Sequence, residues 1–184
     1  MGSALVTADA TAHLDTFPKW IEHNAKVRPN RPAMRHKDLG IWKEWTWAEL
    51  ARIVRDYALG LMAHGLQRGD KIAIIGTNRP KLYWSIMAAQ TIGAVPVPVY
   101  ADSVAEEMAY VLDHAEVKFA CVQDQEQVDK ILSVAERLSR IEMVIYDEPR
   151  GLRDYDHSRL QAIDEVISQG EGMLFSDPAA VNRL

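Results

Sequence analysis

The sequence predicts an α/β fold: a mainly parallel βαβαβαβ sheet flanked by helices and preceded by a helix and a β-hairpin. Three observations lead to this prediction. The run KIAIIGT is apolar enough to be a strand covered on both faces, and AVPVPVY, VKFACVQD and EMVIYD are three further predicted strands. Segments with helical spacing separate these runs. A short aromatic-rich stretch with a turn comes before them. Strands that alternate with helices favour right-handed crossovers and a parallel sheet.

The elements before the sheet follow from local signals. We expect a helix over 17–27, with Pro18 in its first turn. The stretch AMRHKDLGIWKEWTW predicts a hairpin that turns at 38–40. Thr46 and Glu49 form a T-x-x-E capping box, which predicts a long helix ending near position 64.

Punctuating residues divide the alternating part. Asn78 is expected to cap the helix after the first strand, with Pro80 in its first turn. Pro96 and Pro98 predict that the second strand is irregular or lies near an edge of the sheet. The later signals predict four more features: a second capping box at Ser103 and Glu106, a helix over 125–138, a helix over 159–168 closed by Gly170, and a further helix that begins after Ser176 or Asp177.

Composition limits the class of function. The chain has 184 residues, 48% of them hydrophobic and 26% charged, with a net charge of −5 from 21 basic and 26 acidic residues. These values are ordinary for a globular domain, and the mild acidity argues against nucleic acid as the main partner. The most apolar stretch, 86–100, is interrupted by polar residues, glycine and proline, so no transmembrane segment is expected.

Cysteine usage and the N-terminus indicate a compartment. Cys121 is the single cysteine, so no internal disulfide can form, and the start lacks the features of a secretory signal. We therefore expect a cytoplasmic protein, with peripheral contact to the membrane left open. Residues 1–14 are expected to be a disordered or tag-derived start.

Motifs for catalysis are missing from the pattern. There is no G-x-G-x-x-G, no P-loop and no G-x-S-x-G elbow. Asn78 could receive an anion at a helix N-terminus, although a structural cap is the simpler interpretation. Cys121 lies in a predicted buried strand and is interpreted as a core residue. The histidines are scattered, and no metal site is predicted.

Three aromatic residues deserve a functional interpretation beside a structural one. Tyr83, Trp84 and Tyr100 lie on or beside the helix and the strand end where α/β sheets place ligands. Packing in the core is the alternative for each of them.

Particular segments add a resemblance to this pattern. RPAMRHKDLGIWKEWTWAEL, GLMAHGLQRGDKIAIIGTNRPKLYW and AAQTIGAVPVPVYADSVAEEMAYVLDHAEVKFACVQDQEQVDKIL resemble the N-terminal region of AMP-forming long-chain fatty-acid–CoA ligases, members of the adenylate-forming, AMP-binding superfamily. The resemblance covers 16–184. It implies the N-terminal subdomain of the adenylate-forming fold over 15–184, truncated before the family's phosphate loop.

The resemblance also implies a reaction and its participants. The full enzyme would use ATP, Mg²⁺ and CoA to convert a fatty acid into acyl-AMP and then acyl-CoA. The family's T-S-G-T-T-G-x-P-K-G loop is missing here, as are the later motifs that hold the nucleotide and the metal. The chain alone is therefore expected to be inactive, to contain no catalytic residue and to bind none of these cofactors tightly.

Few residues can be carried over from the family. They are Asn78, Arg79 and Pro80 in a structural turn, Tyr83, Trp84 and Tyr100 on the acyl side, and Lys130 on the CoA side.

Two other functions remain open. The chain could be a stand-alone, non-catalytic α/β module that binds an acyl chain or a partner, derived from the same family. A flavodoxin-like or response-regulator domain has only the βα alternation in its favour. If the chain is a truncated subdomain, it should expose apolar surface and self-associate.

Overall fold

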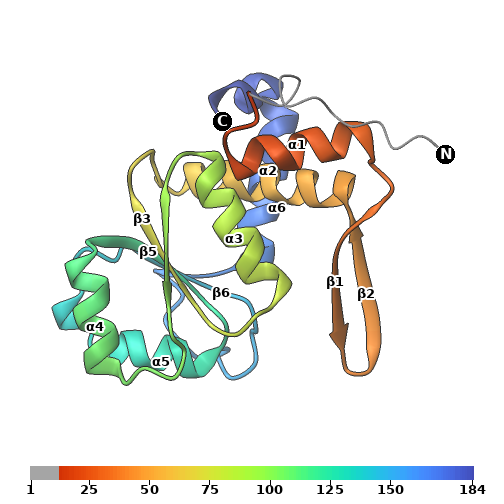
Figure 1. Cartoon of the computed structure of the whole chain (residues 1–184). Helices are drawn as coiled ribbons and strands as arrows, with labels where there is room; N and C mark the ends of the chain where they lie inside the picture. The colour runs from red at the N-terminus through yellow and green to blue at the C-terminus, as the bar shows by residue number, and fades with distance from the viewer. Residues whose placement is uncertain (1–12) are drawn as a thin grey trace.

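The structure is a computed structural model that describes residues 13–184, and Figure 1 shows the whole chain. Most of the expected disordered or tag-derived start, 1–12, lies outside the described residues. The helices are α1 (Phe17–Val27), α2 (Trp47–Ala63), α3 (Pro80–Thr91), α4 (Ala105–His114), α5 (Gln125–Ser133) and α6 (Ile163–Ser176), with 3₁₀ turns η2 (Ala135–Arg137) and η3 (Pro178–Arg183). The strands are β1 (Pro32–Asp38), β2 (Ile41–Thr46), β3 (Lys71–Ile75), β4 (Val95–Val99), β5 (Val117–Val122), β6 (Met143–Tyr146) and β7 (Leu160–Ala162).

The main sheet has five parallel strands in the order β4-β3-β5-β6-β7, and β1 and β2 form a separate antiparallel hairpin. The predicted parallel α/β sheet with a preceding helix and hairpin is confirmed. The chain places β4 on one side of β3 and then β5, β6 and β7 on the other side, so the strand order reverses between β3 and β5. This order is the flavodoxin-like one, in which ligands bind at the carboxyl ends of the strands next to the reversal.

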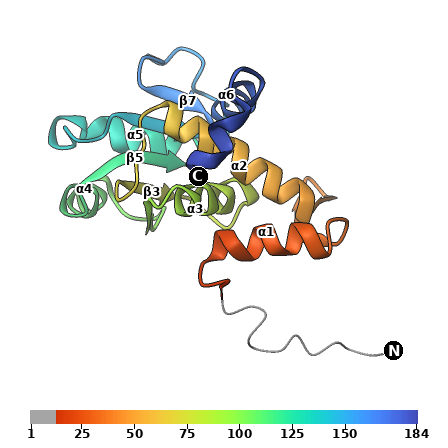
Figure 2. The ribbon, with the colours of Figure 1, turned by 90° about the horizontal axis from the view of Figure 1, so that it is seen from above.

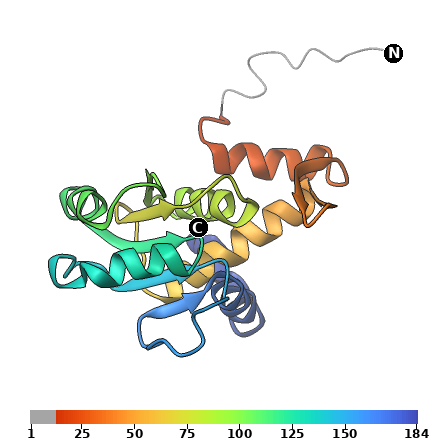
Figure 3. The same ribbon diagram turned by 90° about the horizontal axis from the view of Figure 1, so that it is seen from below.

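Helices cover both faces of the sheet and make three layers (Figures 2 and 3). Alternate strand residues divide between two cores. On one face, Ile72 and Ile74 of β3 pack into the cluster that contains α1, α2, α3 and α6. On the other face, Ala73 and Ile75 pack with α4 and α5. Strand β3 therefore needs apolar residues at successive positions, as its near-continuous apolar run predicts.

Several local predictions are confirmed. Helix α1 has the predicted bounds. The Thr46 hydroxyl accepts from the Glu49 amide at 3.3 Å, and the Glu49 carboxylate accepts from the Thr46 amide at 2.8 Å, so the capping box opens α2. Strand β4 is an edge strand, as its prolines predict. The Val95 amide donates inward to the Asp70 carbonyl, at 2.8 Å, so the alternate Pro96 and Pro98 nitrogens face outward.

Two predicted helix caps are wrong. Helix α3 has Arg79 as its N-cap residue without a side-chain bond, because the Asn78 side chain instead accepts from the Tyr83 hydroxyl at 3.1 Å. Helix α4 begins after Val104, not after Ser103, and no capping box forms there. The Ser103 amide is used in a turn, where it donates to the Tyr100 carbonyl at 3.2 Å.

The C-terminal third differs most from the prediction. Residues 160–162, expected within a helix, form β7 because they pair with β6, and α6 starts only at Ile163. Gly170 does not close that helix but lies buried inside it, against α2. Helix α5 ends at Ser133 and a 3₁₀ turn replaces its predicted end. Asp177 does cap the last element, accepting from the Ala179 amide at 3.1 Å, but that element is a 3₁₀ helix.

Candidate functional site

A cleft opens at the carboxyl ends of β3 and β4, where helix α3 faces the segment that leads into α4. Its volume is about 570 Å³, within the range of small-molecule sites. We call it the β3–β4 cleft, and its lining residues are Ile74, Gly76, Thr77, Asn78, Leu82, Tyr83, Ile86, Pro98, Val99, Tyr100, Ala101 and Asp102.

The cleft brings together part of the predicted site. Tyr83 and Tyr100 both line it, although they lie 17 positions apart in the sequence, and they are 41% and 86% exposed. Asn78 also lines it and holds the Tyr83 hydroxyl. Aliphatic side chains of β3, α3 and β4 form the walls, while the polar groups lie on the two connecting segments. This arrangement suits a largely apolar ligand that carries a polar group.

Trp84 is placed elsewhere. It is 6% exposed, does not line the cleft, and meets Trp45 of the hairpin edge to face, with ring centroids 5.4 Å apart. Its indole N–H finds no acceptor among the residues that the structure describes. The structural interpretation of Trp84, as a packing residue between α3 and the hairpin, fits this position.

Side chains bridge the position where the strand order reverses. Both the amide and the hydroxyl of Thr77, after β3, donate to the Gln123 side-chain oxygen, after β5, and both distances are 2.7 Å. The Thr77 amide is therefore already used within the protein and does not face outward to receive a phosphate. The described loop does not fit ATP, and the described residues contain no cluster of acidic, histidine or cysteine side chains fit to hold Mg²⁺.

Arg79 belongs to a second, smaller cavity of about 330 Å³ beside the cleft, called here the arginine cavity. It is lined by Arg79, Asp124, Gln125, Glu126, Glu148, Arg150 and Gly151. Its acidic residues have partners: Asp124 caps α5, Glu126 pairs with Lys130, and Glu148 pairs with Arg150. The Arg150 guanidinium holds the pKa of the Glu148 carboxyl below its usual value. Acidic residues outnumber basic ones in this lining, so the cavity does not favour an anion.

Lys130 contacts one residue of the β3–β4 cleft, Ala101. Its ammonium donates to the Ala101 carbonyl at 2.5 Å and pairs with Glu126 at 2.9 Å, and its side chain is 19% exposed. Since Ala101 lines the cleft, Lys130 ties α5 to the segment that forms one wall. Its predicted place on the CoA side of the full enzyme stays a prediction.

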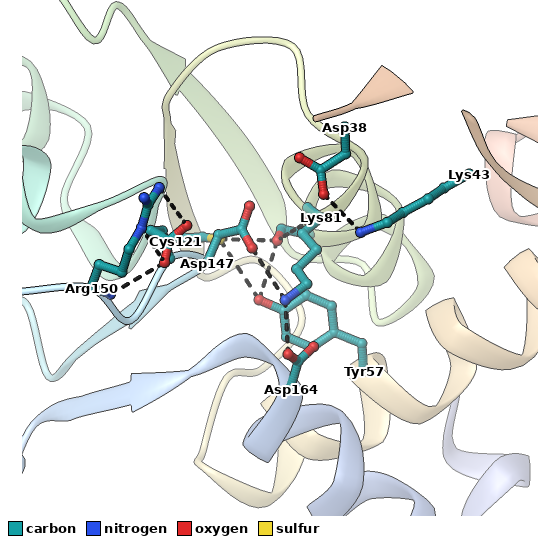
Figure 4. A network of polar contacts seen from close by, with 10 residues as sticks. Asp38, Lys43, Tyr57, Lys81, Cys121, Asp147, Arg150 and Asp164 are labelled. Carbon is teal, nitrogen blue, oxygen red and sulfur yellow. Dashed lines mark hydrogen bonds and ion pairs between the residues drawn. The ribbon is translucent and has the colours of Figure 1, made fainter. Parts of the chain in front are cut away.

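An ion triad that sequence reasoning missed joins three elements at the same edge of the sheet (Figure 4). The Lys81 ammonium, in the first turn of α3, lies 3.2 Å from Asp147, after β6, and 2.8 Å from Asp164, in the first turn of α6. Burial alone would lower the pKa of Lys81, but Asp164 and Asp147 outweigh burial and raise it. The sequence signal was Asp147 directly after a strand, although nothing in the sequence indicates Lys81 as its partner.

A buried polar group lies under this triad. The Ser85 hydroxyl lies 2.8 Å from the Lys81 carbonyl, 3.2 Å from the Tyr57 hydroxyl and 3.0 Å from the Cys121 sulfur. Burial raises the pKa of the Cys121 thiol to about 11 and raises that of Tyr57 well above its usual value. Cys121 is therefore a buried, neutral thiol in the core, as its predicted strand position implies.

The geometry defines a doubly wound α/β fold with an apolar cleft at the carboxyl edge of its sheet and without a phosphate-binding loop in its described part. Residues 21–177 match the family model described as AMP-binding enzyme. The chain belongs to this family. No helix among residues 13–184 combines the length and the apolar character needed to cross a membrane.

Three proteins of similar sequence align with part of this chain. The chain is 40% identical over 79 residues to long-chain-fatty-acid–CoA ligase FadD15 of Mycobacterium bovis, covering 42% of this chain and 13% of that protein. It is 28% identical over 143 residues to long-chain-fatty-acid–CoA ligase ACSBG1 of Rattus norvegicus, covering 77% and 19%. An uncharacterized Mycobacterium tuberculosis protein, Rv1549, is 36% identical over 116 residues, covering 63% and 65%.

A solved structure supports the fold. Acetoacetyl-CoA synthetase from Streptomyces lividans superposes with a TM-score of 0.73 at 21% identity, over 82% of this chain and 24% of that one. The two ligase relatives are much longer than the aligned region, because the chain spans only 13% and 19% of their lengths.

Proposed function

We propose that this chain is the N-terminal subdomain of an ATP-dependent long-chain fatty-acid–CoA ligase. In the proposed reaction, the fatty-acid carboxylate attacks the α-phosphate of Mg-ATP and releases pyrophosphate. The CoA thiol then attacks the acyl carbonyl of the acyl-AMP and releases AMP. Membership of the AMP-binding family supports the class of reaction, and the similarity to two long-chain-fatty-acid–CoA ligases supports the substrate.

The observation that carries the proposal for this chain is the β3–β4 cleft. Its aliphatic walls and its volume of about 570 Å³ suit a hydrocarbon chain. We infer that Tyr83 and Tyr100 line the entrance for the acyl group, while Asn78, Arg79 and Pro80 shape the turn behind it. Residues that bind the triphosphate, Mg²⁺ and CoA are expected outside the described residues, so the chain alone is proposed to be inactive.

Binding of fatty acid tests the cleft directly. A fluorescent fatty acid displaced by palmitate should report saturable binding without ATP. Ile86→Trp, which places a larger ring on the wall of the cleft, should weaken binding about tenfold or more. Val111→Trp, at a half-exposed position on α4 outside the cleft, is the matched control and should bind as the parent does. Equal affinity in both variants would contradict the assignment of the cleft.

The reaction needs a separate test. The source gene should be read past the codon for Leu184, and the longer product, if there is one, assayed for fatty-acid-dependent ATP–pyrophosphate exchange. A reading frame that continues into a phosphate loop, with exchange activity in the long product only, supports the proposal. Exchange by the present chain alone would overturn the proposed inactivity.

A second candidate function is a stand-alone acyl-binding or partner-binding module. One observation favours it: Rv1549 is matched over 65% of its own length, against 13% for the FadD15 ligase. A stop codon after Leu184 together with saturable fatty-acid binding would favour this function over the first.

A further inference from the structure

The turn of the β1–β2 hairpin breaks two local rules at the same place. Leu39 and Gly40 form its two-residue loop, with φ of 47° and 83°. Loops of this type prefer Asn-Gly or Asp-Gly, because a non-glycine residue at positive φ is strained unless its side chain is short and polar. Leu39 is also 96% exposed. The chain thus holds an apolar side chain in solvent at a position where asparagine would be both more polar and less strained.

The neighbouring residues extend the apolar surface. Ile41 and Trp42 are 68% and 66% exposed. Because consecutive strand residues point to opposite faces, these two side chains make the end of the hairpin apolar on both sides. We call Leu39, Ile41 and Trp42 the hairpin tip. Figure 1 shows the hairpin standing beside the body of the molecule, with its turn at the far end from α1 and α2.

Charged side chains of the hairpin lie near its tip. Arg35 pairs with Glu44 at 2.6 Å and Lys43 pairs with Asp38 at 2.8 Å, so both acidic residues of this stretch are neutralised. The third cation, Lys37, lies over the Trp42 ring, 5.9 Å from its centroid. Tryptophan and aliphatic residues beside long cationic side chains match the lipid–water interface, where apolar groups enter the acyl region and cations reach the head-group phosphates.

The small area of the hairpin tip argues against a protein as its binding partner. A buried aromatic side chain contributes at most about 250 Å², and leucine and isoleucine are smaller, so three side chains fall short of the roughly 800 Å² per partner of a stable protein interface. A narrow tip that is apolar on both faces also has no flat surface to offer to a rigid partner. A fluid interface imposes no such requirement.

We propose that the hairpin tip inserts into the interface of a phospholipid bilayer and anchors the chain there peripherally. Leu39, Ile41 and Trp42 enter the acyl boundary, and Lys37 contacts the phosphates. The β3–β4 cleft lies between the first turns of α3 and the segment that leads into α4. Figure 1 shows that segment and the hairpin turn on the same lower side of the molecule. The proposal does not depend on ligase activity.

Vesicle binding tests the proposal with the whole chain. Vesicles of phosphatidylcholine and phosphatidylglycerol in equal parts should sediment with the protein, and brominated acyl chains should quench tryptophan fluorescence. Leu39→Asn creates the preferred turn sequence, so it should keep or improve folding while it lowers partitioning roughly tenfold. Trp42→Ser should remove the quenching by brominated lipid. Phe175→Ser changes another exposed aromatic residue, 86% exposed, and should bind as the parent does.

Three outcomes would overturn the proposal. The first is no binding to these vesicles. The second is binding that Leu39→Asn leaves unchanged. The third is a fall in the molar mass measured by light scattering in Leu39→Asn, which would show that the hairpin tip contacts protein. Because none of these three measurements uses ATP, CoA or fatty acid, failure here would leave the proposed ligase function untouched.

Discussion

Gly170→Ala should destabilise the protein through the crossing of α2 and α6. A Cβ atom at Gly170 would lie 1.8 Å from the Asp56 carbonyl oxygen and 2.6 Å from the Gly60 amide nitrogen. Both are backbone atoms of α2, so no side-chain rotation relieves the contact, and α6 would have to move by about 1.5 Å to restore ordinary contact distances.

The size of the effect follows from two opposing contributions. Overpacking of a well-packed interior costs about 1–3 kcal/mol, and contact with rigid backbone favours the upper end. Replacing a helical glycine by alanine gains up to about 1 kcal/mol. We therefore expect the free energy of unfolding to fall by about 2 kcal/mol, which lowers Tm by about 4–8 °C in a chain of this length.

Gly172→Ala supplies a matched control in the same helix. A Cβ atom there meets nothing within 4 Å, so this variant should gain the helix-propensity contribution, up to about 1 kcal/mol. Urea unfolding followed by circular dichroism measures both variants. If Gly170→Ala is as stable as Gly172→Ala, the close crossing of α2 and α6 is not present in solution and the reasoning fails.

Three further predictions concern the edge of the sheet, the core and the surface. Lys81→Met leaves Asp147 without its cation and should lower the free energy of unfolding by about 1–2 kcal/mol. Because the pKa of Lys81 is raised in the fold, this difference in stability from the parent should be constant from neutral pH to about 10.5 and shrink above it. A difference that instead vanishes near neutral pH would refute the triad. Cys121, whose pKa is raised to about 11, should react with a thiol reagent at pH 8 only on unfolding; rapid labelling of the native chain would disprove its burial. Self-association through exposed apolar side chains should appear in light scattering as a concentration-dependent molar mass, reduced by Phe175→Ser; a constant monomer mass would contradict it.

Local signals predicted what local interactions determine. The bounds of α1 and the capping box at Thr46 and Glu49 depend on neighbours within four residues, and both are confirmed. Asn78 had the right chemistry for a cap, but Tyr83, five residues on, uses its side-chain oxygen. Ser103 and Glu106 had the right spacing, but the preceding turn draws the Ser103 amide to Tyr100.

Long-range contacts explain the remaining differences. Strand β7 is only three residues long, and its backbone pairing with β6 outweighs the helical signal of the sequence. Gly170 looked like a helix terminator because sequence shows a glycine but not the second helix that presses against it. In the candidate site, the presence of Tyr83 and Tyr100 in one cleft was predictable from the topology of parallel strands, since both lie near carboxyl ends of strands. The Lys81 triad was not, because its members are separated by 66 and 83 residues.

The outward-facing prolines of β4 limit the addition of a further strand to this edge of the sheet. In a parallel strand the amide and carbonyl of one residue point to the same side, so the free side of β4 offers carbonyls at Pro96 and Pro98 but no hydrogen there to donate. A further strand along this edge could form only half of the hydrogen bonds of a regular sheet. An aggregate that starts from the β4 edge of the folded protein should therefore lack the cross-β signature and should not raise thioflavin T fluorescence.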